Sequence, residues 1–244
     1  MNTFEIFWLR LNSARSSLFA VLIDPDKFNP KLIDYSLKCK VDCFLVGGSK
    51  INSGNISLTI KKIKSISDTP VIIFPGDEKQ LTPEADGLFL PSLLSGNNSE
   101  YLIGKQILMA PLIRKMKLAF VPMAYLLIDG GKKSSTQKVT QTSPLKISAT
   151  KKIIHTCIAA EQLGFKILYL EAGSGAKSGI PAGLIKKVKR EINLPLIVGG
   201  GIDSKRKLLK AKNAGANMIV VGNALEKNPD LIFELAEVFA RHKH

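Results

Sequence analysis

Eight short apolar runs, spread along the whole chain, constrain the fold more than any other feature of this sequence. Each run is continuous rather than alternating between apolar and polar residues, ends in small or acidic residues, and in most cases precedes a stretch with helical spacing. Such strands are typical of a parallel sheet covered by helices, because both faces of the sheet are then buried. The runs lie at residues 18–23, 42–46, 70–74, 87–90, 119–128 or part of it, 167–170, 196–198 and 218–221.

The stretches between the later runs contain residues that typically begin and end helices. Thr150 is positioned to cap a helix that Gly164 would end in the left-handed conformation. Pro181 suits the first turn of the next helix, and Asp203 or Ser204 can cap the helix after it. The second half of the chain therefore reads as strands that alternate with helices.

Eight strand–helix units in 244 residues match a (β/α)8 barrel, which usually needs about 250 residues. We therefore predict an α/β fold, namely a TIM barrel that forms a single domain over residues 1–244 and includes irregular helical segments. A doubly wound open sheet is the alternative. The long polar insertion at residues 129–146 follows the fifth run, so we expect it to be a loop on the active-site face.

Composition supports a large buried core and excludes several classes of protein. With 45% hydrophobic and 23% charged residues, the chain is not intrinsically disordered. Its longest apolar run, residues 119–128, contains Pro122 and has about half of the ~20 residues that a transmembrane helix needs. The first residues lack the pattern of a secretory signal, and three cysteines are too few for a disulfide framework. We expect a cytoplasmic protein with reduced thiols.

The net charge of +15, from 35 Lys and Arg against 20 Asp and Glu, predicts an anionic partner. Nucleic acid, an anionic membrane surface and a phosphorylated metabolite all fit that charge. The lysines do not cluster with aromatic residues as a nucleic-acid surface requires, so we expect no nucleic-acid partner. They lie mostly at helical spacing, as in residues 186–190 and 205–212, which indicates solvated helix faces with peripheral contact to an anionic membrane surface.

Residues that follow the first two runs form a candidate metal site. Asp24 and Asp26 flank Pro25, and carboxylate oxygens at a rigid turn suit Mg²⁺. Asp26 could instead only cap the following helix, so we assign the metal to Asp24. Two glycines and Ser49 follow the second run; the Ser49 hydroxyl can join the ion or its phosphate, although a turn with an N-cap serine would have the same sequence.

The sixth run ends in a carboxylate followed by a glycine-rich loop. Tyr169 and Glu171 are two residues apart on a strand, so both side chains point to one face. A negative charge beside an anion-binding loop is hard to explain by structure alone, whereas a Glu171 that holds or deprotonates a substrate hydroxyl explains it. The loop matches neither a P-loop, because Ala176 replaces the required glycine, nor a dinucleotide loop, because its glycines are too widely spaced.

Glycine-rich loops also follow the seventh and eighth runs. Residues 199–201 are three successive glycines, and Gly222 and Asn223 follow the last run. Phosphate sites of barrels are commonly built from these two loops, in which backbone N–H groups are the donors. A triple glycine could also be only a tight turn, but the second glycine loop on the adjacent strand favours phosphate binding.

The residues absent from the strand ends also narrow the chemistry. His242 and His244 lie near the end of the chain, and His155 lies in the middle of a predicted helix. We therefore expect neither histidine acid–base catalysis nor histidine-ligated zinc. No lysine at a strand end stands out as a Schiff-base former, which argues against an aldolase.

Seven short motifs occur in order at residues 22–27, 46–49, 89–96, 101–104, 169–175, 198–202 and 221–224. Together they resemble the geranylgeranylglyceryl phosphate synthase family, which includes the bacterial PcrB-type heptaprenylglyceryl phosphate synthases. The resemblance covers essentially the whole chain, and the order and spacing of the motifs make it specific. Residues 127–131 and their polar continuation are similar to the larger-loop, group II branch, from which residues 132–142 diverge.

The resemblance implies a prenyltransferase of ether phospholipid biosynthesis. Its substrates would be sn-glycerol 1-phosphate, alkylated at the 3-hydroxyl, and a prenyl diphosphate, with geranylgeranyl diphosphate the expected donor. It implies that Asp24 and Ser49 hold Mg²⁺, that Glu171 deprotonates the hydroxyl, and that the protein is a homo-oligomer, either a dimer or a hexamer. Glycerol 1-phosphate would lie against Tyr169, Leu170, Glu171, Ala172, Gly173, Ser174, Gly175, Gly200, Gly201, Gly222 and Asn223, and the prenyl groove would run past Leu93, Leu94, Tyr101 and Ile103.

The sequence leaves prenyl chain length open, because the depth of the groove depends on packing, and the residues allow two other functions. Another phosphate-binding barrel enzyme, such as a sugar-phosphate isomerase or a cyclase, would share the glycine loops but need no prenyl groove. A non-catalytic barrel that binds anionic lipid would need no Mg²⁺, and the presence of Asp24, Glu171 and Asn223 argues against it. The groove residues themselves could also be ordinary helix packing.

Overall fold

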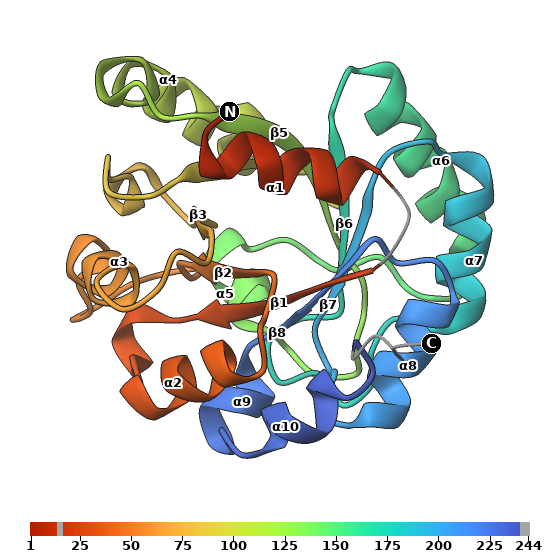
Figure 1. Ribbon diagram of the computed structural model, residues 1–244. Coiled ribbons are helices and arrows are strands. Elements are labelled where there is room, and N and C mark those ends of the chain that lie inside the picture. The colour runs from red at the N-terminus through yellow and green to blue at the C-terminus, as the bar shows by residue number, and fades with distance from the viewer. Residues whose placement is uncertain (14–16, 240–244) are drawn as a thin grey trace.

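The strands of this protein close into a parallel barrel. The computed structural model describes residues 1–13 and 17–239, and its eight strands pair in chain order, with β8 returning to β1 (Figure 1). This confirms the predicted (β/α)8 fold and excludes the open sheet, which would leave two edge strands without a partner. The strands are β1 (Leu18–Ile23), β2 (Cys43–Val46), β3 (Val71–Ile73), β4 (Gly87–Leu93), β5 (Phe120–Leu127), β6 (Ile167–Glu171), β7 (Leu196–Gly199) and β8 (Met218–Val221).

Strand β4 runs three residues beyond its predicted end and passes through Pro91. A proline inside a sheet normally removes a ladder hydrogen bond. Here β4 pairs with β3 only as far as Leu88, whereas on its other side it continues along β5, where Pro91 lies opposite Met123. Pro91 is therefore tolerated, and the extended strand places Leu93 at the carboxyl end of the barrel.

Helices fill the connections between the strands, and the predicted irregular segments are present. Two short 3-10 helices, η1 (Pro25–Lys27) and η2 (Glu78–Gln80), follow β1 and β3, and a π-helical segment, η3 (Glu100–Gly104), precedes α4. The predicted loop after β5 contains a short helix. The α-helices after β1 are α2 (Pro30–Lys38), α3 (Ile56–Lys64), α4 (Lys105–Met116), α5 (Ser135–Thr140), α6 (Thr150–Gln162), α7 (Ala182–Glu191), α8 (Lys205–Asn213), α9 (Asn223–Lys227) and α10 (Leu231–Ala236).

The predicted helix ends are partly correct. Gly164 follows α6 with φ +86°, as expected. Thr150 does not cap that helix, because it is the first helical residue and its hydroxyl donates to the carbonyl of Ile147 at 3.0 Å. Ser204 is the residue before α8, but its side chain makes no capping hydrogen bond within the described part of the chain.

A helix that the sequence analysis did not predict closes the amino end of the barrel. Helix α1 (Thr3–Asn12) lies across that end (Figure 1) and buries Phe4, Phe7 and Leu11. A side chain at Gly87 would overlap the Phe4 ring, so the helix is in tight contact with the start of β4. Helix α1 therefore covers the end of the barrel opposite to the carboxyl ends of the strands.

The core has two layers, which follow from the alternation of side chains along each strand. One set packs between the strands and the outer helices and includes Leu168 and Leu170. The other fills the barrel interior and includes Ile167, Tyr169 and Tyr125. The predicted inward direction of Tyr169 follows from this alternation.

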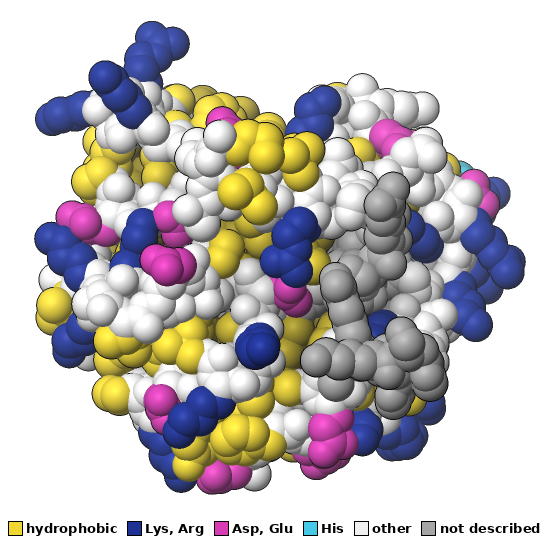
Figure 2. Space-filling model, in the orientation of Figure 1, with side chains coloured by type: hydrophobic (Ala, Val, Ile, Leu, Met, Phe, Trp, Pro, Cys, Tyr) yellow, Lys and Arg dark blue, Asp and Glu magenta, His cyan; other side chains and the backbone are white. Residues whose placement is uncertain are grey.

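The charged side chains lie mainly over the outer helices. Figure 2 shows the face that carries α1, where Lys and Arg lie mostly around the edge with Asp and Glu among them. Pairs such as Lys38 with Asp34, 2.8 Å apart and both exposed, match the prediction of solvated helix faces. Within residues 1–13 and 17–239, none of the helices has the length and apolar character to cross a membrane. His155 is exposed on α6, and His242 and His244 lie outside the described residues.

Candidate active site

A cavity of about 590 Å³ opens at the carboxyl ends of the strands. Every strand contributes a lining residue at or near its end, so positions far apart in the sequence converge on one site. Among the residues predicted to act in the site, those that line the cavity are Asp24, Ser49, Leu93, Tyr101, Tyr169, Glu171, Ser174, Gly175, Gly200, Gly201, Gly222 and Asn223.

Five of the predicted residues do not line the cavity. Leu170 points to the outer helices, because it alternates with Tyr169 and Glu171 along β6. Leu94 likewise faces away from Leu93, and it lines a separate groove beside α6. The remaining three are Ile103, which is 55% exposed on the π-helical segment, and Ala172 and Gly173, which are buried behind the loop.

Glu171 is a buried carboxylate that faces the cavity. Its Oε1 accepts a hydrogen bond from the backbone N–H of Gly173 at 2.6 Å. Burial raises the pKa of Glu171 to about 7, although the Gly173 N–H and the neighbouring Tyr169 hydroxyl both favour the charged form. A carboxyl group with a pKa near neutrality is suited to accept and return a proton at physiological pH.

The loops after β6 and β7 wrap closely around this carboxylate. Gly173, Gly175, Gly200 and Gly201 all have φ between +67° and +97°, which favours glycine. A Cβ at Gly200 would overlap Oε1 of Glu171, so this glycine is required by space as well as by conformation. The two loops therefore bring bare backbone to the cavity wall, as binding of an anion by N–H groups requires.

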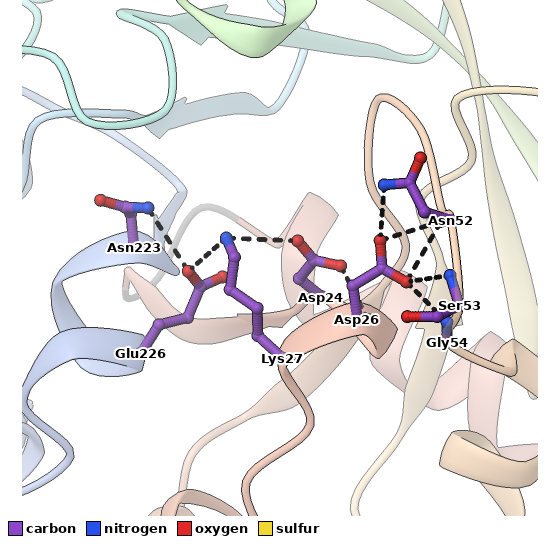
Figure 3. Close-up of polar contacts among 8 residues, drawn as sticks. All are labelled: Asp24, Asp26, Lys27, Asn52, Ser53, Gly54, Asn223 and Glu226. Atoms are coloured by element: carbon purple, nitrogen blue, oxygen red, sulfur yellow. Dashed lines mark hydrogen bonds and ion pairs between the residues drawn. The ribbon is translucent and has the colours of Figure 1, made fainter.

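Asp24 lies across the barrel, where β1 ends. Its Oδ1 accepts from the Asp26 N–H at 3.0 Å, and its Oδ2 lies 3.4 Å from Nζ of Lys27 (Figure 3). Lys27 also pairs with Glu226 at 2.9 Å, and Glu226 in turn accepts from the side chain of Asn223 at 3.3 Å. These contacts join the loop after β1 to the loop after β8, so that Asp24 and Asn223 belong to one polar network.

Asp26 has a structural role that sequence reasoning missed. It does not act as a helix cap, because its carboxylate accepts hydrogen bonds from the backbone N–H groups of Asn52, Ser53 and Gly54 (Figure 3). These three donors lower the pKa of Asp26 well below its usual range. Asp26 therefore fixes the loop after β2, on which Ser49 lies, and its oxygens are already occupied.

The donors at Asp24 and Ser49 fit Mg²⁺ better than most other metals. Across the described residues, no three His, Cys, Asp or Glu side chains group so that they could hold a metal ion by themselves. Mg²⁺ commonly uses one or two protein oxygens and takes its other ligands from water and substrate phosphates. One carboxylate and one hydroxyl match that pattern, whereas zinc sites are built mainly from cysteine and histidine side chains.

Several lining residues were not predicted. Thr136 of α5 lies over the mouth, where its Oγ1 is 3.0 Å from Oγ of Ser49. Phe74 and Tyr125 meet Tyr169 on the cavity wall. The alternation of side chains along the strands could have identified Phe74 and Tyr125, because both lie in predicted runs. Nothing in the sequence places Thr136 in the site, since α5 belongs to the divergent insertion.

Comparisons with known proteins agree on one family. The model of the PcrB family matches residues 11–239. A geranylgeranylglyceryl phosphate synthase of Spirosoma linguale is 41% identical over 224 residues, 90% of each chain, and one of Methanosphaera stadtmanae is 38% identical over 225 residues, 91% of this chain and 92% of that protein. The crystal structure of (S)-3-O-geranylgeranylglyceryl phosphate synthase from Thermoplasma acidophilum in complex with the substrate sn-glycerol-1-phosphate has a TM-score of 0.89 at 32% identity, covering 98% of both chains.

Proposed function

The chain belongs to the PcrB family, and from this premise we propose that it transfers a prenyl group from a prenyl diphosphate to the 3-hydroxyl of sn-glycerol 1-phosphate. Its similarity to the synthase that binds sn-glycerol-1-phosphate, over nearly the whole length of both chains, supports this acceptor. The observation that carries the proposal is the buried Glu171, held among glycine loops on one side of the cavity and facing Asp24 on the other.

The residues divide the reaction between the two sides of the barrel. The glycerol phosphate would bind at the loops after β6, β7 and β8, where backbone N–H groups meet the phosphate. Glu171 would hold the 3-hydroxyl and take its proton while the oxygen lone pair forms the ether bond to C1 of the prenyl group. The C1–O bond to diphosphate breaks, and its electron pair leaves with the diphosphate.

Mg²⁺ is part of the proposal. Asp24 and Ser49 would hold it, and its charge would stabilise the departing diphosphate. Lys27 lies 3.4 Å from Asp24, so a second positive charge is already present on this side of the cavity. Positive charge would therefore lie beside the departing diphosphate, and the base Glu171 would lie beside the hydroxyl that loses its proton.

Geranylgeranyl diphosphate is the proposed donor. Its chain would lie along the cavity residues Pro91, Leu93, Tyr101 and Met109. Apolar walls of this kind bury the prenyl chain and keep water from the reacting carbon. We also propose that the protein is a homo-oligomer and that it works in the cytoplasm. Light scattering of the purified protein tests the oligomeric state, and cell fractionation tests the location.

A product assay tests the function directly. Purified protein is given Mg²⁺, sn-glycerol 1-phosphate and an equal mixture of prenyl diphosphates of increasing length, and the lipid products are identified by mass. Product with one preferred chain length, lost when EDTA is added, supports the reaction and identifies the donor. If no donor gives product while glycerol 1-phosphate still binds, the protein is another phosphate-binding barrel enzyme.

A further inference from the structure

Three aromatic rings from different strands meet on the cavity wall. Phe74 at the end of β3 lies 5.5 Å from Tyr169 of β6 and 5.8 Å from Tyr125 of β5, measured between ring centroids. Tyr125 and Tyr169 are 5.3 Å apart in an edge-to-face arrangement. All three residues are among those that line the cavity.

The rings lie between the two polar sides of the site. The strands follow one another around the barrel in chain order, so β3 is next to β2, which precedes Ser49, and β6 carries Glu171. The contact between Phe74 and Tyr169 therefore reaches across the interior from the neighbourhood of the metal side to that of the base. We call Phe74, Tyr125 and Tyr169 the aromatic floor.

Packing alone does not explain this floor. The hydroxyl of Tyr169 is buried, and the group beside it is the carboxylate of Glu171, whose charged form it favours. It lies against Gly199, where a Cβ would overlap it, and beside the carboxylate of Glu171. Burying a hydroxyl costs free energy unless a polar group satisfies it, so a site selected only for packing would have phenylalanine there.

The chemistry of the proposed function calls for negative charge in this place. When the C1–O bond of an allylic diphosphate breaks with its electron pair on the oxygen, positive charge spreads over C1 and C3 of the prenyl group. The face of an aromatic ring attracts a cation within about 6 Å of its centre. The reacting carbons must lie between the diphosphate and the hydroxyl at Glu171, which is where the floor lies.

On the basis of the proposed function, we propose that the aromatic floor stabilises the allylic cation, and that Phe74 and Tyr125 are catalytic residues through their ring faces. The rings hold positive charge as it develops, while Glu171 takes the proton of the attacking hydroxyl. Phe74 carries no polar group, so its contribution is the electron density of the ring together with its shape.

Fluorinated phenylalanines at position 74 separate those two contributions, since each added fluorine withdraws density from the ring face with little change in shape. Mono-, di- and trifluorophenylalanine are introduced at this position, and prenyl transfer is measured in single turnovers. We expect log kcat to fall steadily with each fluorine, so that kcat drops by about 10-fold in total, while KM for the prenyl diphosphate changes little. Equal kcat across the series would overturn the proposal.

Phe89 offers a matched control, because it is fully buried in the barrel interior and is not among the cavity residues. The same series at Phe89 should leave kcat unchanged. Tyr125→Phe should keep most of the activity and Tyr125→Leu should lose at least 10-fold, with circular dichroism to show that both are folded. A Tyr125→Leu protein that is folded and as active as Tyr125→Phe would also overturn the proposal.

The wild-type rate separates this inference from the proposed function. If the wild-type protein gives no ether product with any donor, the proposed function itself fails. If it gives product and the fluorinated series is flat, the function stands and the aromatic floor has only a packing role.

Discussion

Replacing Glu171 by glutamine should abolish most turnover without disturbing the site. The amide oxygen can still accept the hydrogen bond from Gly173 that Oε1 accepts at 2.6 Å, so the loop keeps its anchor. The variant loses only the ability to take a proton. General-base catalysis contributes about 10²- to 10⁴-fold, and we expect kcat to fall by that factor while glycerol 1-phosphate binds within about threefold of wild type.

The pH dependence gives a second measure of the same residue. With a pKa of about 7, Glu171 is about one tenth deprotonated at pH 6 and about nine tenths deprotonated at pH 8. Wild-type kcat should therefore rise almost tenfold between these values and level off above pH 8. The residual rate of Glu171→Gln should lack this rise.

Measurements of kcat from pH 5.5 to 9, together with calorimetric titration of glycerol 1-phosphate, test the loss of turnover and the pH dependence. Glu191→Gln, at the exposed end of α7, is the matched control and should behave as wild type. If Glu171→Gln keeps more than about a tenth of the activity, or shows the same pH profile, Glu171 is not the base.

The remaining predictions concern stability, the metal and the glycine loop. The pKa of Glu171 is raised from 4.5 to about 7 in the folded protein, so the folded state holds the carboxyl proton more tightly than the unfolded state does. The stability of the wild-type protein should therefore decrease as pH rises from 4.5 through 7. In thermal unfolding, Glu171→Gln should be more stable than wild type by up to ~3 kcal/mol at pH 8, and this difference should vanish at pH 4.5. Asp24→Ala should lose activity together with its dependence on Mg²⁺, and unchanged Mg²⁺ binding in calorimetry would remove Asp24 from the metal site. Gly200→Ala places a Cβ at a left-handed position against Oε1 of Glu171; kcat should fall by at least about 100-fold, because the base is displaced, and normal kcat would show that the loop moves freely.

The barrel and the strand-end residues could be predicted because they depend on local pattern. Each continuous apolar run predicts a buried parallel strand, and the carboxyl ends of such strands meet at one face. That rule alone selects Asp24, Ser49, Glu171 and the glycines after β6 to β8, all before any distance is known. Strand alternation further gives the inward direction of Tyr169.

Predictions for residues outside the regular strands were less complete. The sequence predicts Leu94 and Ile103 to be groove residues with Leu93 and Tyr101, but both lie outside the cavity. The reason is that side-chain direction changes with each residue at the end of β4 and along the π-helical segment. Sequence spacing does not show where a strand ends to within one residue. A helical turn of irregular geometry cannot be assigned from the pattern either.

The sequence by itself determined the class of fold, the end of the barrel that carries the chemistry, and most of the polar residues there. Only the tertiary structure showed that the Asp26 carboxylate accepts hydrogen bonds from the loop at Asn52. It also placed the hydroxyl of Thr136 beside that of Ser49, which is 87 residues away in the sequence. It also decided the raised pKa of Glu171. The physical reason is that strands form from local periodicity, whereas burial, hydrogen-bond partners and ring contacts depend on side chains that the closed barrel brings together from distant positions.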